Sequence, residues 1–215
     1  MKLYGYFRSS AAYRTRIALN LKGLAWDPTY IHLTRDGGEQ FKPDYLKLNP
    51  QALVPALEDD DGTVLTQSMA IVEYLDETRP EPPLLPKSPA ERARVRAIAQ
   101  AVACDIHPLN NLRVLRFLTK DLGLSEDDKN RWYKHWVETG LGAVEKLLAG
   151  HPATGRFCHG DNPTLADICL VPQVANARRF DCDLSNCPTV VAIEQACLEM
   201  PAFSSAAPEN QPDAA

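Results

Sequence analysis

The 215-residue sequence lacks several features that mark specialised classes of protein. It has no C-x-x-C pair, and Cys158 beside His159 has no second ligand pair at zinc-site spacing, so we expect no metal. It has no apolar run of the roughly 20 residues that a membrane-spanning helix needs, so we expect no membrane partner. A glycine-rich phosphate loop, internal repeats and low-complexity segments are absent too. With 45% hydrophobic residues, the chain is expected to fold around a substantial core.

An excess of basic charge is also missing. The 23 Lys and Arg residues against 28 Asp and Glu residues give a net charge of -5 at pH 7, which argues against nucleic acid as the main partner. Six cysteines are present, but Met1 runs almost directly into an apparent strand over residues 2–6 rather than into a secretory leader. We therefore expect reduced thiols and a cytoplasmic location.

The first 79 residues alternate between strand-like and helix-like patterns. Ile17, Ala18 and Leu21 share one helix face, which Gly23 ends, and Asp59-Asp60-Asp61-Gly62 predicts a hairpin turn. The predicted order is strand 2–6, helix 11–22, strand 28–33, helix 41–48, hairpin strands 54–58 and 63–66, and helix 68–78.

A proline-rich segment over residues 79–89 is the best candidate for a linker between two domains. Beyond it, apolar residues recur at helical spacing, for example Val95, Ile98 and Val102, and Pro108 is expected to kink that helix. We therefore predict an α/β domain over residues 1–83 and an all-helical domain over residues 84–215, with a frayed tail from Pro208.

Polar residues stand where the predicted strands give way to helices. Ser9 and Ser10 begin one helix, where free N–H groups and the helix dipole favour an anion, although a serine there can simply cap the helix. The neighbouring Arg8 favours an anionic ligand. Val54-Pro55 enters a strand and Gln67-Ser68 starts another helix, so these features are expected at one edge of a small sheet.

These segments, taken in order, resemble the zeta class of the glutathione transferase superfamily, the class of the maleylacetoacetate isomerases. Residues 6–19 are similar to the zeta signature, in which Ser-Ser-Cys leads into Arg-x-Arg-Ile-Ala-Leu. Residues 49–57 (NPQALVPAL), the Gln67-Ser68 helix start, the RPEPPLLP linker and residues 164–167 (TLAD) are further landmarks. The resemblance covers essentially the whole chain.

The resemblance implies a thioredoxin-like amino-terminal domain that binds glutathione and an all-helical carboxy-terminal domain that completes the substrate pocket. It implies a cis Pro55 that leaves the Val54 backbone to pair with the glutathione backbone. Gln67 and Ser68 would hold the γ-glutamyl carboxylate, with Gln51 near the other end of glutathione, and Ser9 and Ser10 would lie at its sulfur. The resemblance also implies a homodimer.

One position departs from the family pattern, because Ala11 stands where the family triplet has cysteine. The reacting sulfur must then come from glutathione. Ser9, the neighbouring N–H groups and Arg8 would stabilise its thiolate. The implied reaction is the isomerisation of maleylacetoacetate to fumarylacetoacetate in aromatic catabolism.

The substrate of such a reaction carries two carboxylates and requires cationic contacts. Arg8 and Arg179, which precedes Phe180 as in the family, are candidates for this contact. Arg113 is another, although it is equally interpretable as a solvated helix charge, and His107 and Asn111 match polar pocket positions of the family. Three alternatives remain at this point: a maleylpyruvate isomerase, a conjugating or dehalogenating transferase, and a non-catalytic scaffold of the same fold.

Overall fold

The computed structural model describes residues 1–214 as two compact units. Among these residues, the first unit contains residues 1–83 together with residues 199–214, and the second contains residues 84–198. The boundary between Pro83 and Leu84 coincides with the expected linker. Residues 199–214, however, belong to the first unit, whereas the sequence pattern had placed them with the helical domain.

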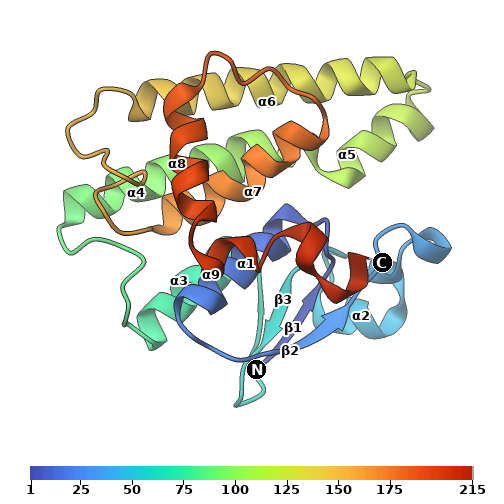
Figure 1. The fold of residues 1–215 in the computed structure, drawn as a ribbon. Helices are drawn as coiled ribbons and strands as arrows, with labels where there is room; N and C mark the ends of the chain where they lie inside the picture. The colour runs from blue at the N-terminus through green and yellow to red at the C-terminus, as the bar shows by residue number, and fades with distance from the viewer. Residues whose placement is uncertain (215) are drawn as a thin grey trace. The chain divides into compact units, whose positions relative to one another are not determined.

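The first unit is a small mixed sheet with helices, in the predicted order of elements (Figure 1). Its strands lie in the order β2-β1-β3-β4, with β1 parallel to β2 and antiparallel to β3, which in turn pairs antiparallel with β4. The elements are β1 (Lys2–Gly5), α1 (Ser10–Leu21), β2 (Asp27–Tyr30), α2 (Pro43–Leu48), β3 (Ala56–Glu58), β4 (Val64–Thr66) and α3 (Ser68–Thr78).

The core of the first unit lies where α1 and α3 pack together and against the sheet. Ile17, Leu57, Ile71 and Leu75 are fully buried in it. Each of these side chains contributes about 1.5–3 kcal/mol by leaving water, which is why both helices are fixed relative to the strands that precede them.

The carboxyl-terminal segment is ordered rather than frayed. It forms α9 (Pro201–Ser204) and two short 3₁₀ turns, Pro208–Asn210 and Pro212–Ala214. Phe203 is completely buried, and the Tyr13 hydroxyl of α1 donates a hydrogen bond to its carbonyl oxygen at 3.1 Å. In Figure 1 the red α9 lies beside the blue α1. The segment therefore stays in place because it completes the core of the first unit.

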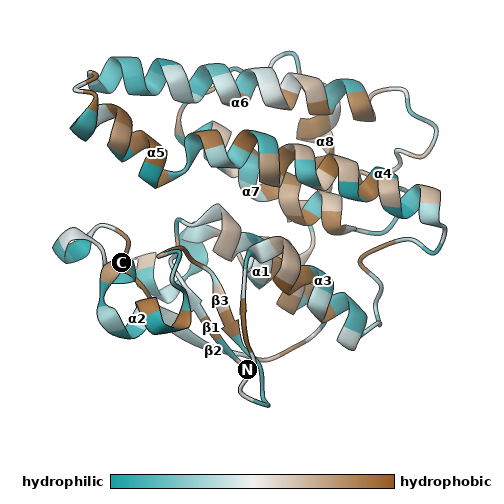
Figure 2. Cartoon of the chain, turned by 180° about the vertical axis from the view of Figure 1, so that it is seen from behind, coloured by the Kyte–Doolittle hydropathy of each residue, from teal (hydrophilic) through white to brown (hydrophobic). Residues whose placement is uncertain are grey.

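The second unit is helical throughout, as predicted. It contains α4 (Pro89–Gln100), α5 (Leu112–Arg116), α6 (Glu126–Leu148), α7 (Leu165–Arg179) and α8 (Pro188–Leu198). Figure 2 shows the amino-terminal half of α6 as mostly hydrophilic, and the buried residues of this helix are Tyr133, Val137, Leu141, Val144, Glu145 and Leu148. No helix among residues 1–214 is long and apolar enough to cross a membrane.

The helix that begins with α4 changes its geometry before Pro108. It widens into a π-helix over Ala101–Ile106, tightens into a 3₁₀ turn over His107–Asn110 and ends at Asn111, whose backbone is extended. Proline cannot donate the backbone hydrogen bond that a continuing α-helix needs, and the helix changes to a 3₁₀ turn at the position where Pro108 was expected to kink it.

Candidate functional site

Three segments of the first unit meet at one end of its sheet, and the strand register identifies these segments. Tyr4 of β1 lies opposite Ala56, and Ala56 lies opposite Thr66. The end of β1, the start of β3 and the end of β4 are therefore neighbours. The turn that carries Ser9, the loop that carries Val54 and the start of α3 follow or precede these strand ends, so the expected polar edge is present.

Ser9 caps α1, and its hydroxyl group can still donate a hydrogen bond. Its Oγ accepts a hydrogen bond from the Ala12 N–H at 3.2 Å, while the Ser9 N–H donates to the Tyr6 carbonyl at 2.9 Å. A serine hydroxyl can accept and donate at the same time, so the cap leaves its own hydrogen available for another acceptor. The capping and ligand-binding interpretations of Ser9 are therefore compatible.

The helix starts at α1 and α3 share a feature that suits an anionic ligand. Neither helix has an acidic residue in its first turn, whereas α4, α6 and α7 place their own carboxylates there. A carboxylate in the first turn satisfies the N–H groups and dipole of its helix. The starts of α1 and α3 are therefore open to an anionic ligand, as are those of α5, α8 and α9, but only α1 and α3 begin at the polar edge of the sheet.

The loop before β3 is fixed in place while its next peptide remains open. The Tyr45 hydroxyl and the Asn49 side-chain amide both donate to the Leu53 carbonyl, at 2.6 and 2.7 Å. The Val54 backbone has no hydrogen bond within residues 1–214. The Val54–Pro55 peptide bond is cis, as the resemblance implied. A peptide backbone held this way can pair with the backbone of an extended ligand.

Gln67 and Ser68 lie where α3 begins, and both are positioned by other residues. Gln67 has a positive φ of 68°, a conformation uncommon outside glycine, and its side-chain amide donates to Gln51 Oε1 at 2.8 Å. Ser68 is buried, and Arg14 Nη1 donates to its Oγ at 3.4 Å. The structure thus brings Gln51 and Gln67 together, and Arg14 of α1 to Ser68 of α3.

Arg14 is the residue of this region that sequence reasoning passed over. It is only 2% exposed and is the largest fully buried side chain of the protein. Its position one turn after Ser10, on the same face of α1, could have indicated from the sequence that Arg14 lies near the site. A buried guanidinium behind the start of α3 adds positive potential where an anionic group would bind. Arg8, in contrast, is exposed, with its guanidinium 4.9 Å from the ring centroid of Phe7.

In the second unit, two adjacent arginines at the end of α7 have different surroundings. Arg178 is engaged by Glu194, which accepts hydrogen bonds from both its Nε and Nη2. Arg179 is exposed, and its guanidinium lies 5.1 Å from the ring centroid of Phe180, which stacks on Tyr133 at 3.6 Å. Burial raises the pKa of Tyr133 to about 12, and the Arg179 guanidinium opposes this shift. Arg179 is thus the better placed of the two to meet a ligand.

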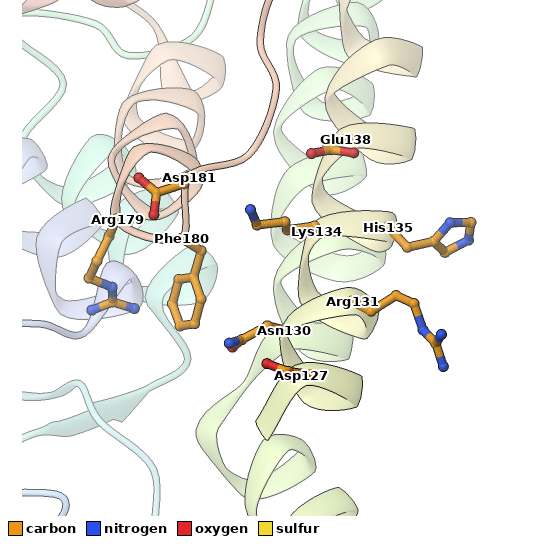
Figure 3. A pocket seen from close by; sticks show the side chains of 9 residues that line it. All are labelled: Asp127, Asn130, Arg131, Lys134, His135, Glu138, Arg179, Phe180 and Asp181. Atoms are coloured by element: carbon orange, nitrogen blue, oxygen red, sulfur yellow. The ribbon is translucent and has the colours of Figure 1, made fainter. Parts of the chain in front are cut away.

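Arg179 opens onto a cleft of about 800 Å³ beside α6, which is large enough for a small organic acid. Figure 3 shows Asn130 and Lys134 on the side of α6 that faces Phe180, whereas Arg131 and His135 point away. Lys134 points toward Phe180, and Arg179 lies on the other side of that ring (Figure 3). The cleft is lined by these two cations and Arg131 together with the carboxylates Asp127, Glu138 and Asp181, and Lys134 was not anticipated from the sequence.

The 3₁₀ turn over His107–Asn110 and the cap of α5 carry the polar residues expected on this helix. Asn111 Oδ1 accepts from the Arg113 N–H at 3.1 Å, so Asn111 is foremost the cap of α5, which also holds the exposed Arg113 in its first turn. Within residues 1–214, the side-chain amides of Asn110 and Gln173 are shielded from water and have no hydrogen-bond partner. His107 is half-buried. No group of three or more potential metal ligands is present in that same range.

Comparison with known proteins places this geometry in a family. Residues 8–78 match the family of the glutathione S-transferase amino-terminal domain. The chain is 53% identical to a probable maleylacetoacetate isomerase of Vibrio cholerae, over 99% of this chain and 97% of that protein. It is 50% identical to a maleylpyruvate isomerase of Ralstonia sp. over 100% of both chains.

Solved structures agree with the sequence relatives. A holo structure of maleyl pyruvate isomerase, described as a bacterial zeta-class glutathione S-transferase, matches with a TM-score of 0.96 and 50% identity over 100% of both chains. A maleylacetoacetate isomerase from Methylobacterium extorquens AM1, with malonate and glutathione bound, matches with a TM-score of 0.96 and 46% identity over 100% of both chains.

The fold and the polar sheet edge define a glutathione transferase. More narrowly, the chain belongs to the zeta class, the family of the maleylacetoacetate and maleylpyruvate isomerases. The resemblance drawn from the sequence is confirmed, and so are the predicted fold and the enzyme class, a glutathione-dependent isomerase.

Proposed function

We propose that the chain is a cytoplasmic, glutathione-dependent cis–trans isomerase that converts maleylacetoacetate to fumarylacetoacetate in aromatic catabolism. The observation that carries the proposal is the edge of the first unit's sheet, where two helix starts without carboxylates of their own flank the unpaired Val54 backbone. The names of the relatives support the choice of substrate class.

Glutathione would be held at both helix starts of this edge. The backbone of Val54 would pair with its peptide groups, and Ser68 with the first N–H groups of α3 would bind the γ-glutamyl carboxylate. Gln67 and Gln51, already joined by a hydrogen bond, would bind the polar groups next to it. Arg14, buried behind Ser68, adds a positive charge that favours the same carboxylate.

Ser9 would stabilise the ionised thiol. Bound glutathione supplies a thiolate that adds to the substrate's double bond, allows rotation about it and then leaves. Because the Ala12 N–H occupies one lone pair of the Ser9 hydroxyl, the hydroxyl hydrogen is free to donate to sulfur. The nearby Ser10 and the first N–H groups of α1 add to this stabilisation, and Arg8 contributes its charge from the surface.

Arg179 would bind a carboxylate of the keto acid. It is exposed at a cleft, whereas its neighbour Arg178 is committed to Glu194. Arg8, Arg113 and His107 are further proposed contacts of the substrate. Asn111, whose Oδ1 caps α5, is a further proposed polar contact.

A glutathione-dependent ultraviolet assay with maleylacetoacetate and maleylpyruvate, each offered separately, tests this function. The expected result is isomerisation that needs glutathione and does not consume it, with the higher kcat/KM for maleylacetoacetate. A higher value for maleylpyruvate would support the second candidate, which the 50% identity to the Ralstonia enzyme favours. Net consumption of glutathione would instead indicate a conjugating transferase.

The assembly is proposed to be a homodimer, because this fold usually assembles through a two-fold interface. Light scattering at micromolar protein concentration measures it. A monomer mass would contradict the dimer without affecting the proposed chemistry.

A further inference from the structure

The carboxyl-terminal segment reaches the turn that carries Ser9, and its contacts fall on one residue of that turn. Phe7 is the first residue inside the turn, which the Ser9 N–H closes onto the Tyr6 carbonyl. The Phe7 N–H donates to Asp213 Oδ2 at 3.0 Å, across 206 positions of sequence. The Phe7 carbonyl accepts from Arg16 Nη2 at 3.2 Å. Both backbone groups of this residue are therefore held.

The second of these contacts also depends on the carboxyl-terminal segment. Arg16 is only 5% exposed, and its Nε donates to the carbonyl oxygen of Ala206 at 2.9 Å. Burial lowers the pKa of Arg16 to about 10, and the negative charge of Asp213 opposes this shift. Burial, and to a smaller extent the same charge of Asp213, raises the pKa of the Tyr30 hydroxyl on β2. Asp213 thus fixes the turn directly and stabilises the charge of Arg16, which fixes it from the other side.

We propose that Asp213 is a positioning residue for the Ser9 hydroxyl. The turn has few ways to move while both backbone groups of Phe7 are held, so the Ser9 hydroxyl keeps one direction relative to the start of α1. Without Asp213 the Phe7 N–H must find water, and the turn gains alternative arrangements. The inference rests on the proposed function, since it assigns Asp213 a part in stabilising the thiolate of bound glutathione.

Two substitutions of Asp213 separate its hydrogen bond from its charge. Asp213→Ala removes the acceptor, whereas Asp213→Asn keeps an acceptor oxygen and the shape of the side chain. The matched control is Glu209→Ala, because Glu209 is an exposed carboxylate of the same segment with no hydrogen bond or ion pair in the described chain. Comparison with this control removes effects of net charge and of general disturbance of the segment.

The first measurement needs no catalysis. Amide hydrogen exchange of the segment containing Phe7 is expected to be faster in Asp213→Ala than in Glu209→Ala, with Asp213→Asn between them. The second is the ultraviolet absorbance of the glutathione thiolate on the enzyme as pH is varied. Asp213→Ala is expected to raise the pKa of the bound thiol and to lower kcat/KM at pH 7 by about 3-fold, less than the loss expected when the Ser9 hydroxyl itself is removed, with most of the loss recovered near pH 9.

Two results would overturn the inference. One is a thiol pKa of bound glutathione in Asp213→Ala that equals the value in the Glu209→Ala control. The other is a loss of activity in Asp213→Ala that is the same at every pH and follows only the loss of stability. If Asp213→Ala does not fold, the same comparison is made with Asp213→Leu, which keeps the approximate size of the side chain and removes both the acceptor and the charge; a raised thiol pKa supports the inference and an unchanged one overturns it. A wild-type protein that binds no glutathione in calorimetry would refute the proposed function itself, which distinguishes the two failures.

Discussion

Replacing Ser9 by alanine tests the two roles of its hydroxyl group, because the roles depend differently on pH. The cap on the Ala12 N–H is lost at every pH, and its loss is expected to lower the free energy of unfolding by about 1 kcal/mol. The hydrogen bond to the thiolate matters only where the thiol would otherwise be protonated. Its loss should therefore appear in turnover near neutral pH and fade in alkaline solution.

The size of the catalytic effect follows from the thiol pKa. A hydrogen bond to a charged group contributes about 1.5–3 kcal/mol, which corresponds to roughly 1–2 pKa units. If bound glutathione has a thiol pKa of about 6.5, roughly three quarters of it is ionised at pH 7. Raising that pKa to about 8 leaves roughly a tenth ionised, an activity loss of about 8-fold. At pH 9 both forms are more than about nine tenths ionised, so the loss should nearly vanish.

The assay is kcat at saturating glutathione from pH 6 to pH 9, together with thiolate absorbance and thermal unfolding. Ser88→Ala is the matched control, because Ser88 caps α4 through the Glu91 N–H at the same 3.2 Å. It should lose similar stability and keep the wild-type pH profile. If Ser9→Ala lost the same factor at all pH values and left the thiolate absorbance unchanged, Ser9 would be a helix cap and nothing more.

Three further outcomes are expected. Arg179→Ala should raise KM for the keto acid about 10-fold or more at every pH from 6 to 9, while Arg178→Ala, which breaks the pair with Glu194, should lower the melting temperature and leave KM nearly unchanged. Asp167→Ala should lower the free energy of unfolding by about 3–5 kcal/mol in denaturant titration, since its carboxylate accepts from the buried Cys158 and Thr164 N–H groups. Alkylation of the protein should leave turnover intact once glutathione has been replenished, because among the six free cysteines only Cys104 is exposed. Inactivation without unfolding would contradict this.

Local sequence patterns determined most of the fold. The spacing of apolar residues in α1, the turn residues before β4 and the proline-rich linker are signals between neighbours in the chain, and the structure has the predicted elements within a few residues. The capping box of Thr164 and Asp167 is equally local, since its two residues are three positions apart. Helix starts can be predicted from local sequence because a cap and the N–H groups that it satisfies belong to the same turn.

The sequence order of the motifs also identified the family, because the Ser-Ser turn, the NPQALVPAL stretch and the Gln67-Ser68 helix start each mark a fixed place at the sheet edge. The sequence could not show which of two neighbouring residues of the same type is already engaged by another residue. Arg178 and Arg179 are adjacent and chemically identical, and only the position of Glu194 on α8 shows that Arg178 is already paired. Asn110 and Asn111 differ in the same way, since only the start of α5 reveals which amide is a cap.

Tertiary structure alone decided the fate of the carboxyl-terminal segment. Its composition, polar and rich in proline, is that of a frayed tail, and no local pattern reveals that Phe203 fills the core beside α1. The contacts of Asp213 with Phe7 and of Arg14 with Ser68 join residues 206 and 54 positions apart. Such pairs form because the topology returns the chain to the same place, and their free energy depends on burial that exists only once the whole unit has folded.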